Sequence, residues 1–336
     1  MNSIVVMPDF FVDRLIKLDS KKQFFDALAN KARFGGGSVR GIPTVDMKGG
    51  NAVNIAYCLA SLGVKVTLFT IADDIGSAII RQIFLKFGAK SDLRIINGKH
   101  GCTTSFEFRD ETNTKVNVMV SDIGDNANFG PERIDSAGDL KILNNADGVI
   151  VVNWASNLKG TQLAEHAFTN SPKALHFLDP ADIETRKQEF LDSITKLSDI
   201  IDVLSINENE CNSLAAVVGI DPLFIECYSQ DSVRNAAKKL AEKIGVSIDL
   251  HTRIGAAWSN GKETEYVHAI KVEALTLTGA GDSWDAADII GYLAGLDAKE
   301  RLIYANACSS LYIRNPYAQP ATMTEVSELL ERVGYK

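Results

Sequence analysis

The chain has 336 residues, 46% of them hydrophobic and 23% charged, and a formal net charge of -8 at pH 7. This composition is typical of a globular protein with a sizeable core, and no apolar run approaches the roughly 20 residues that a membrane-spanning helix needs. The acidic balance, without a run rich in lysine and arginine, argues against nucleic acid or an anionic membrane as the main partner. We therefore expect neither among its partners.

The N-terminal stretch and the cysteines both indicate a cytoplasmic protein. Residues 1–8 lack a basic segment and are too short for a signal peptide, so we expect a first buried strand there. The five cysteines are odd in number, scattered and without a CxxC pair: Cys58, Cys102, Cys211, Cys227 and Cys308. This spacing indicates neither a zinc site nor a disulfide framework, which fits a reducing compartment.

Apolar runs that resemble buried strands alternate with segments of helical periodicity. The predicted strands are 4–7, 64–71, 148–152, 174–178, 201–204 and 246–250. The predicted helices are 52–62, 75–87, 158–168, 186–197, 209–218 and 233–244, and a short hairpin (256–259 and 265–268) precedes further helices at 283–293, 299–312 and 324–333. Alternation of this kind predicts an α/β fold: a three-layer αβα sandwich around a mostly parallel sheet.

Two stretches break this rhythm and predict a small β-sheet. Residues 103–109 and 115–121 alternate between apolar and polar around a polar turn, as expected of an antiparallel hairpin with one solvated face. Residues 14–47, which contain Gly35-Gly36-Gly37, look poorly helical beyond the first turn or two. We interpret both as a lid over the carboxyl edge of the main sheet. The prediction is a single domain, 1–336, with lid segments at approximately 14–47 and 101–121.

The run Leu277-Thr-Gly-Ala-Gly-Asp282, followed by an apolar segment, is the most informative motif. A glycine-rich turn that opens a helix directs unpartnered N–H groups and the positive end of the helix dipole at an anion. A carboxylate in the same turn repels phosphate, unless it also accepts a proton from an attacking hydroxyl. Phosphate site and base together indicate a kinase, although aspartate in a first helical turn is also common for structural reasons.

This motif resembles the second signature of the ribokinase-like, or PfkB-type, carbohydrate and nucleoside kinases. That signature usually reads Asp-Thr-x-Gly-Ala-Gly-Asp, whereas this chain begins it with Thr276-Leu277, so the leading Asp and Thr are absent. The base and the glycine turn are intact. The resemblance implies a ribokinase-like fold, ATP and Mg²⁺ as cofactors, Asp282 as the base, and the backbone of Gly279, Ala280 and Gly281 as the anion hole.

An earlier motif, Gly49-Gly50-Asn-Ala-Val-Asn54, resembles the first signature of the same family, which contacts the sugar. The resemblance therefore implies substrate contacts for Gly49, Gly50 and Asn54, although a glycine or asparagine helix cap explains the residues equally well. Asp9 and Asp13 follow the first strand, where open α/β sheets bind ligands. By position Asp13 matches the substrate-binding aspartate of the family better than Asp9, and either could be a loop acid or a helix cap.

Asn207 and Glu210 resemble the NxxE motif with which the family organises Mg²⁺. Glu210 is therefore the predicted metal-site residue and Asn207 the predicted cofactor residue. Asparagine at a helix start with glutamate three residues later also forms a near capping box, which stabilises a helix without any metal. The two roles are compatible.

The nucleotide side of the resemblance is carried by residues in the last third. Thr252 and Gly255 lie where the family has a glycine-containing turn below the nucleotide, with Thr252 in place of the first glycine. Asn306 corresponds to the position that borders the adenine pocket. His251 and His268 are interpreted as structural, because a lone histidine at a strand end is more often hydrogen-bonded structure than a base.

The sequence thus predicts an ATP- and Mg²⁺-dependent kinase that phosphorylates a hydroxyl of a sugar or sugar-like molecule. The alternatives are a nucleoside kinase of the same fold and a non-catalytic sensor of sugars or nucleosides. A phosphorylated sugar would require cations in the substrate pocket, and Arg33, Arg40 and Lys48 are the candidates. By analogy with the family, two copies could pair as a homodimer through the lid.

Overall fold

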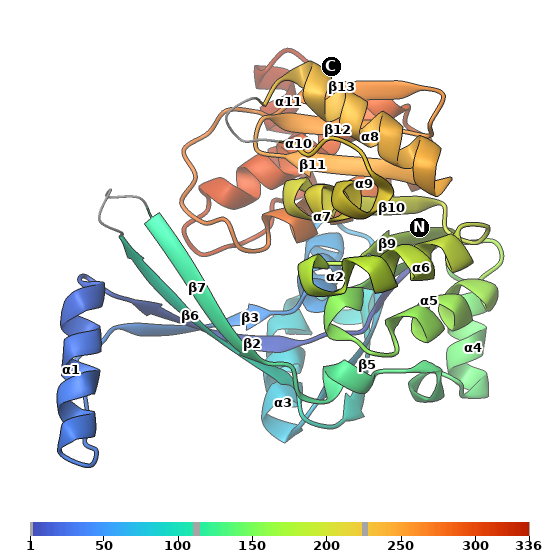
Figure 1. Cartoon of the computed structure of the whole chain (residues 1–336). Helices are drawn as coiled ribbons and strands as arrows, with labels where there is room; N and C mark the ends of the chain where they lie inside the picture. The colour runs from blue at the N-terminus through green and yellow to red at the C-terminus, as the bar shows by residue number, and fades with distance from the viewer. Residues whose placement is uncertain (1–2, 110–114, 224–227, 336) are drawn as a thin grey trace.

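The computed structural model describes residues 3–109, 115–223 and 228–335 and contains two β-sheets (Figure 1). The larger sheet has nine strands, and helices cover both of its faces. The smaller sheet has four strands and projects from this body. The predicted turn at 110–114 and Cys227 lie outside the described residues.

The nine-stranded sheet is parallel except at one end. Its order is β13 (Thr264–His268), β12 (Gly255–Ser259), β11 (Ser247–Thr252), β10 (Val203–Asn207), β9 (Leu175–Asp179), β8 (Gly148–Val152), β1 (Ser3–Met7), β4 (Lys65–Ala72) and β5 (Ser91–Asn97). Only β11, β12 and β13 pair antiparallel. The edge strand β5 was not predicted, because none of its residues is fully buried and it therefore lacks a continuous apolar run.

Two helical layers enclose this sheet, as the side chains of β1 illustrate. Val5 and Met7 pack into the core below α4 (Ala137–Asn144), α5 (Gly160–Thr169), α6 (Lys187–Leu197), α7 (Glu208–Val218) and α8 (Gln230–Ile244). Ile4 and Val6 pack on the opposite side, which α2 (Asn51–Ser61), α3 (Asp74–Phe84) and α9 (Ala280–Leu293) cover. The helices α10 (Ala298–Arg314) and α11 (Met323–Arg332) extend that layer. The predicted α/β class with a mostly parallel sheet is confirmed.

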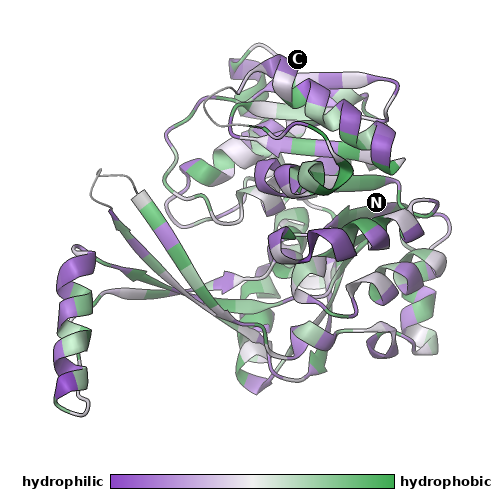
Figure 2. Ribbon diagram, in the orientation of Figure 1, coloured by the Kyte–Doolittle hydropathy of each residue, from purple (hydrophilic) through white to green (hydrophobic). Residues whose placement is uncertain are grey.

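The smaller sheet, which we call the lid, has the order β3 (Thr44–Gly49), β2 (Phe11–Lys17), β6 (Gly101–Arg109) and β7 (Lys115–Asp122). The predicted hairpin is the pair β6–β7, which is antiparallel, whereas β2 and β6 run parallel. Polar and apolar residues are mixed along these strands (Figure 2), whereas the central strands of the main sheet, such as β1 and β8, are almost entirely apolar. The lid therefore buries much less of its side-chain surface than the body does.

The prediction of a poorly helical segment at 14–47 was wrong. The structure has a helix of 13 residues there, α1 (Lys21–Arg33), whose N-cap Ser20 accepts a hydrogen bond from the Gln23 N–H. Phe25, Leu28 and Ala32 recur at helical spacing along α1, but no residue of the helix is buried, so this face does not join the core. Its alanines, lysines and leucine are good helix formers, and that propensity was the available signal. Among the described residues, no helix is long and apolar enough to cross a bilayer.

Candidate active site

Polar side chains gather where the parallel strands of the main sheet end. Asp9 follows β1, Asn153 follows β8, Asp179 ends β9 and Asn207 ends β10. The carboxyl edge of an open α/β sheet is the usual ligand-binding edge. The N-termini of α2 and α9 also meet here, because side chains of the first turn of α2 bond to the first turn of α9.

No side chain of the described residues caps the N-terminus of α9. It begins at Gly279, which has a φ of 85° and lies so close to Tyr312 that a Cβ would come within 2.3 Å of the Tyr312 hydroxyl. A Cβ on Gly281 would lie 3.3 Å from Cε1 of His251. The Ala280 N–H donates to the carbonyl of Leu277 at 3.2 Å. Because Gly279 and Gly281 have no side chains, the backbone at this helix end can fit between Tyr312 and His251 and remain accessible to an anion.

Asp282 lies in the first turn of α9 and is held by two amides. Asn51 Nδ2 donates to one carboxylate oxygen at 2.9 Å, and Asn54 Nδ2 donates to the other at 2.8 Å. Burial, with a further contribution from the nearby carboxylate of Asp179, raises the pKa of Asp282 to about 8 against the lowering effect of the two amides. The structure thus brings the predicted base and the predicted GGNxxN motif together.

The N-terminus of α2 has the same glycine start and is capped from a distance. Gly50 has a φ of 89° and no side chain to offer. Asp9, which follows β1, accepts from the N–H groups of Asn51 (3.0 Å) and Ala52 (2.8 Å), and Asn153 Nδ2 donates to it at 2.9 Å. Asp9 is therefore a helix cap, one of the alternatives that its sequence position allowed.

Asp13 and Gly49 lie side by side on neighbouring lid strands. A Cβ on Gly49 would come within 2.2 Å of an Asp13 carboxylate oxygen, so only glycine leaves room for this acid. Burial raises the pKa of Asp13 to about 6, against a hydrogen bond from Thr103. The first glycine of the motif positions the predicted substrate aspartate, which is a role the sequence did not reveal.

A cavity of about 440 Å³ lies between the lid and the body. Among the residues that line it are Asp13, Lys48, Asn54, Tyr57 and Tyr312. Two of the four predicted substrate residues, Asp13 and Asn54, therefore reach the same cavity, whose volume falls in the usual range for small-molecule sites. Asn54 also links it to Asp282.

Asn207 and Glu210 form a complete capping box at the start of α7. Asn207 Oδ1 accepts from the Glu210 N–H at 3.1 Å, and the two oxygens of Glu210 accept from the backbone N–H and Nδ2 of Asn207, both at 2.7 Å. Burial and the charge of Asp179 raise the pKa of Glu210. In the described part of the chain, no three acidic, histidine or cysteine side chains converge as a metal cage.

The predicted nucleotide residues have partners within the last third of the chain. Thr252 Oγ1 donates to the carbonyl of Gly255 at 2.7 Å and closes the turn between β11 and β12. Asn306 accepts from Trp284 Nε1 at 2.9 Å and donates to the carbonyl of His268 at 3.2 Å. None of Thr252, Gly255 and Asn306 lines the cavity below the lid.

Several site residues were missed by the sequence prediction. Asn153 and Asp179 are the polar residues at which apolar strands end, so strand ends were the available signal. Asp285 lies one helical turn after Asp282, is fully buried and accepts from Ser205 Oγ at 2.5 Å. Its pKa is raised by burial and by Asp179. All three acids of α9, Asp282, Asp285 and Asp288, are buried, and nothing in the sequence marks Asp285 as a site residue.

The two histidines were interpreted as structural, and the described contacts agree with that for His251. Its ring packs against Trp284, with ring centroids 5.2 Å apart. Burial lowers the pKa of His251 to about 4, so the ring is neutral at physiological pH.

Comparison with known proteins agrees with this geometry. The model of the pfkB family carbohydrate kinases matches residues 13–325. The chain is 28% identical over 267 residues to the ATP-dependent ribose-1-phosphate kinase of Halopiger xanaduensis (78% of this chain, 79% of that protein), and 24% identical over 300 residues to the ribokinase of Bacillus subtilis (88% and 92%). The structure of Arabidopsis thaliana ribokinase complexed with ribose and ATP superposes with a TM-score of 0.71 at 21% identity, over 98% of both chains. The chain therefore belongs to the pfkB family of carbohydrate kinases, which transfer a phosphoryl group to an alcohol.

Proposed function

We propose that this protein is an ATP- and Mg²⁺-dependent kinase that phosphorylates a hydroxyl of a ribose-type sugar, with Asp282 as the base. The observation that carries the proposal is the position of Asp282. It is a buried carboxylate held by Asn51 and Asn54 at a helix N-terminus that no side chain caps. The N-terminus of the helix would stabilise the negative charge of the transferring phosphoryl group, and the carboxylate would accept the proton of the hydroxyl.

In this mechanism the acceptor hydroxyl lies in the cavity with its proton directed at Asp282. A bond forms between the hydroxyl oxygen and the γ-phosphorus, and the bond from that phosphorus to the bridging oxygen of the diphosphate breaks. The proton passes to Asp282, whose pKa of about 8 suits a base near neutral pH. Of the predicted anion hole, the backbone N–H groups of Gly279 and Gly281 would stabilise charge on the transferring group, whereas that of Ala280 already donates to the Leu277 carbonyl.

The residues present fit ATP and Mg²⁺ in different ways. Gly281 leaves a space at the helix end that a side chain would fill, which suits a phosphate. The nucleotide would extend from there toward Thr252, Gly255 and Asn306. Mg²⁺ commonly keeps several waters and binds through few carboxylates and substrate phosphates, which suits Glu210 and Asn207 better than an all-protein cage would. When bound, the metal neutralises charge on the phosphates.

The names of the two relatives direct the choice of acceptor. One is a ribose-1-phosphate kinase and the other a ribokinase, so a ribose ring is the shared element. A nucleoside is the second candidate, because Tyr57, Tyr312 and Tyr317 line the cavity and aromatic rings can stack on a base.

The test is release of ADP from ATP and Mg²⁺ with ribose, ribose 1-phosphate, adenosine and a panel of hexoses, with Asp282→Asn as the control. We expect turnover on a ribose derivative that the variant loses. Turnover that survives in Asp282→Asn would contradict the assignment of the base. If a sugar raises the melting temperature but no acceptor is phosphorylated, the protein is a sensor and not a kinase.

We also propose that two copies pair through the lid. The register places Leu15 beside Val45 and Ser105, and Ser105 beside Met119, on one face where Val45 and Met119 are about half exposed. Met119→Asp should weaken a dimer measured by light scattering, whereas Val118→Asp, on the opposite face, should do so less. A wild-type protein that stays monomeric at high concentration would contradict this proposal.

A further inference from the structure

Lys48 is a lysine at the cavity that pairs with no carboxylate among the described residues. It belongs to β3, lines the cavity and donates from Nζ to Asn54 Oδ1 at 2.7 Å. Its ammonium group also lies over the ring of Tyr57, at 4.8 Å from the centroid. Within the described residues, no acid forms an ion pair with it at 4.0 Å or less. The pKa of Lys48 is lowered by desolvation, against the smaller opposing effect of the charges of Asp282 and Asp13.

Another buried cation of this protein shows what a purely structural role looks like. Arg301 is fully buried and pairs with both Asp249 and Asp288. A buried charge is stable when its partners are supplied, and Arg301 receives them from β11 and α9. Within the described part of the chain, Lys48 receives a neutral amide oxygen and an aromatic face but no carboxylate, which leaves donors of the ammonium group for a ligand in the cavity.

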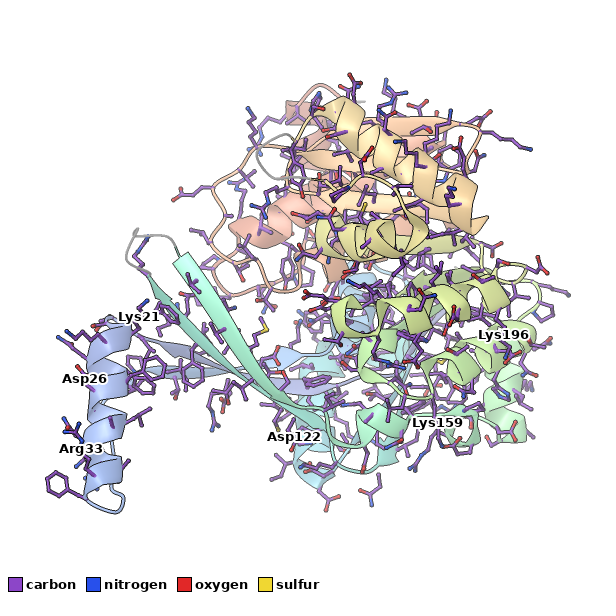
Figure 3. All side chains as sticks on the ribbon, viewed as in Figure 1. Lys21, Asp26, Arg33, Asp122, Lys159 and Lys196 are labelled. Carbon is purple, nitrogen blue, oxygen red and sulfur yellow. The ribbon has the colours of Figure 1, made fainter. Side chains whose placement is uncertain are left out.

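The other cations near the lid do not compete for this role. Arg14 is exposed and forms a bidentate pair with Asp46. Arg33 lies on α1, far from the body of the molecule (Figure 3). Lys86 lies over the same Tyr57 ring at 4.7 Å but is exposed and does not line the cavity.

The contacts also fix where such a ligand charge would be. Asn54 bonds Lys48 with its oxygen and Asp282 with its nitrogen, at 2.7 and 2.8 Å. The ammonium group and the catalytic carboxylate therefore lie within roughly 8 Å of each other. That is the span of one small sugar, so the same molecule can offer a hydroxyl to Asp282 and an anionic group to Lys48.

We infer that Lys48 recognises an anionic substituent, a phosphate or a carboxylate, on the sugar that this kinase phosphorylates. The inference rests on the proposed function and adds the charge class of its acceptor. Asp13, on the neighbouring strand, then binds a hydroxyl of the sugar and excludes a second anion from its own side. Lys48 is a specificity residue in this scheme, and it also positions Asn54 against the base.

The experiment compares kcat/KM for ribose 1-phosphate, ribonate and ribose in the wild type and in Lys48→Met, Lys48→Arg and Lys86→Met. The ratio between a charged and an uncharged acceptor is the quantity of interest, because loss of support for Asn54 lowers both values together. A charge-assisted contact predicts that Lys48→Met lowers this ratio by about 30-fold to 100-fold. Lys48→Arg, which keeps the charge, should stay within about tenfold of the wild-type ratio.

Ribose 1-phosphate and ribonate distinguish the two possible anionic groups. The acceptor with the higher kcat/KM shows whether Lys48 recognises a phosphate or a carboxylate. Lys86→Met should leave the ratio within about threefold, because an exposed charge is screened. If Lys86→Met lowers this ratio as much as Lys48→Met does, the preference arises from long-range electrostatic attraction. That result would contradict a direct contact between Lys48 and the acceptor. An unchanged ratio in Lys48→Met would assign the lysine to phosphoryl transfer instead.

Calorimetric binding of ribose 1-phosphate and ribose without nucleotide keeps the test independent of catalysis. Preferential binding of ribose 1-phosphate that Lys48→Met abolishes supports the inference even if no acceptor is phosphorylated, an outcome that would refute the kinase proposal alone. Suppose instead that the wild type binds ribose, ribose 1-phosphate and ribonate with equal affinity and phosphorylates them with equal kcat/KM. That result would overturn the inference and leave the kinase proposal standing.

Discussion

The helices α2 and α9 begin with the same kind of glycine turn, but the N-terminus of α2 is capped by a carboxylate and that of α9 is not. Each starts at a glycine with positive φ, at Gly50 and Gly279, and neither glycine can cap its helix with a side chain. Asp9 reaches the first from β1 and accepts two of its N–H groups. No side chain caps the second. One helix dipole is thus satisfied internally, whereas the other is available to a ligand anion.

The start of α7 adds a third case, in which the helix caps itself. Asn207 and Glu210 supply the complete capping box from within four residues of sequence. Local sequence therefore reveals a self-capped helix. It cannot distinguish a helix capped from a distance from one left open for a ligand, because the difference depends on a residue elsewhere in the chain.

The largest effect is expected at the open helix end. Asp282→Asn removes the base and should lower kcat by about 10²-fold to 10⁴-fold, with nucleotide affinity retained. Because the carboxylate must be ionised to accept a proton and its pKa is raised to about 8, kcat/KM of the wild type should rise with pH up to that value. Steady-state kinetics between pH 6 and 9 measure both. A profile that is flat across this range would argue against Asp282 as the base.

The distant cap of α2 should show the next largest effect, on stability. Asp9→Ala leaves two backbone donors and the Asn153 amide unpartnered in a buried site, so the free energy of unfolding should fall by about 2 to 4 kcal/mol. Asp73→Ala is the matched control, because Asp73 caps α3 at a half-exposed position, and its loss should cost about 1 kcal/mol. Urea denaturation compares the two. Equal losses would mean that burial adds nothing to the cap.

These helix ends also show how far sequence reasoning reaches. Periodicity predicted the buried strands and most helices, since burial on both faces leaves a continuous apolar pattern. It failed for α1, where no residue is buried, and for β5, which is half exposed. In those two segments, the pattern of apolar residues does not follow which residues are buried.

The site was predictable only where one short motif contains the whole chemistry. Gly279 to Asp282 is such a motif, and the structure places it beside Asn54 as expected of a common site. The role of Gly49 depends on Asp13, which lies on the neighbouring strand. The role of Lys48 depends on the absence of an acidic partner among the described residues. Such relations arise from the register of the lid and the approach of α2 to α9, which single-sequence patterns do not encode.

Filling the open helix end should separate function from stability. Gly281→Ala places a methyl group 3.3 Å from His251 at the proposed phosphate site, and we expect kcat to fall by about tenfold to a hundredfold. The free energy of unfolding should change by no more than about 1 kcal/mol, because alanine favours a helix. Gly138→Ala, in the first turn of α4, is the control and should not affect kcat, because its added methyl group would make only an ordinary contact, 3.7 Å from Ser136 Oγ. Unaltered kcat in Gly281→Ala would show that no ligand approaches this turn.

The smallest effect tests whether the self-capped helix has a second role. Glu210→Gln keeps one acceptor for the Asn207 N–H and should cost less than about 1 kcal/mol in the free energy of unfolding. If Glu210 also orders the metal, the Mg²⁺ concentration for half-maximal activity should rise by about tenfold, since a charge is lost near the hydrated ion. Glu300→Gln in the capping box of α10 makes the same change at an exposed helix start. Equal Mg²⁺ dependence in the two variants would reduce Glu210 to a cap and make α7, like α2, a helix end satisfied entirely within the protein.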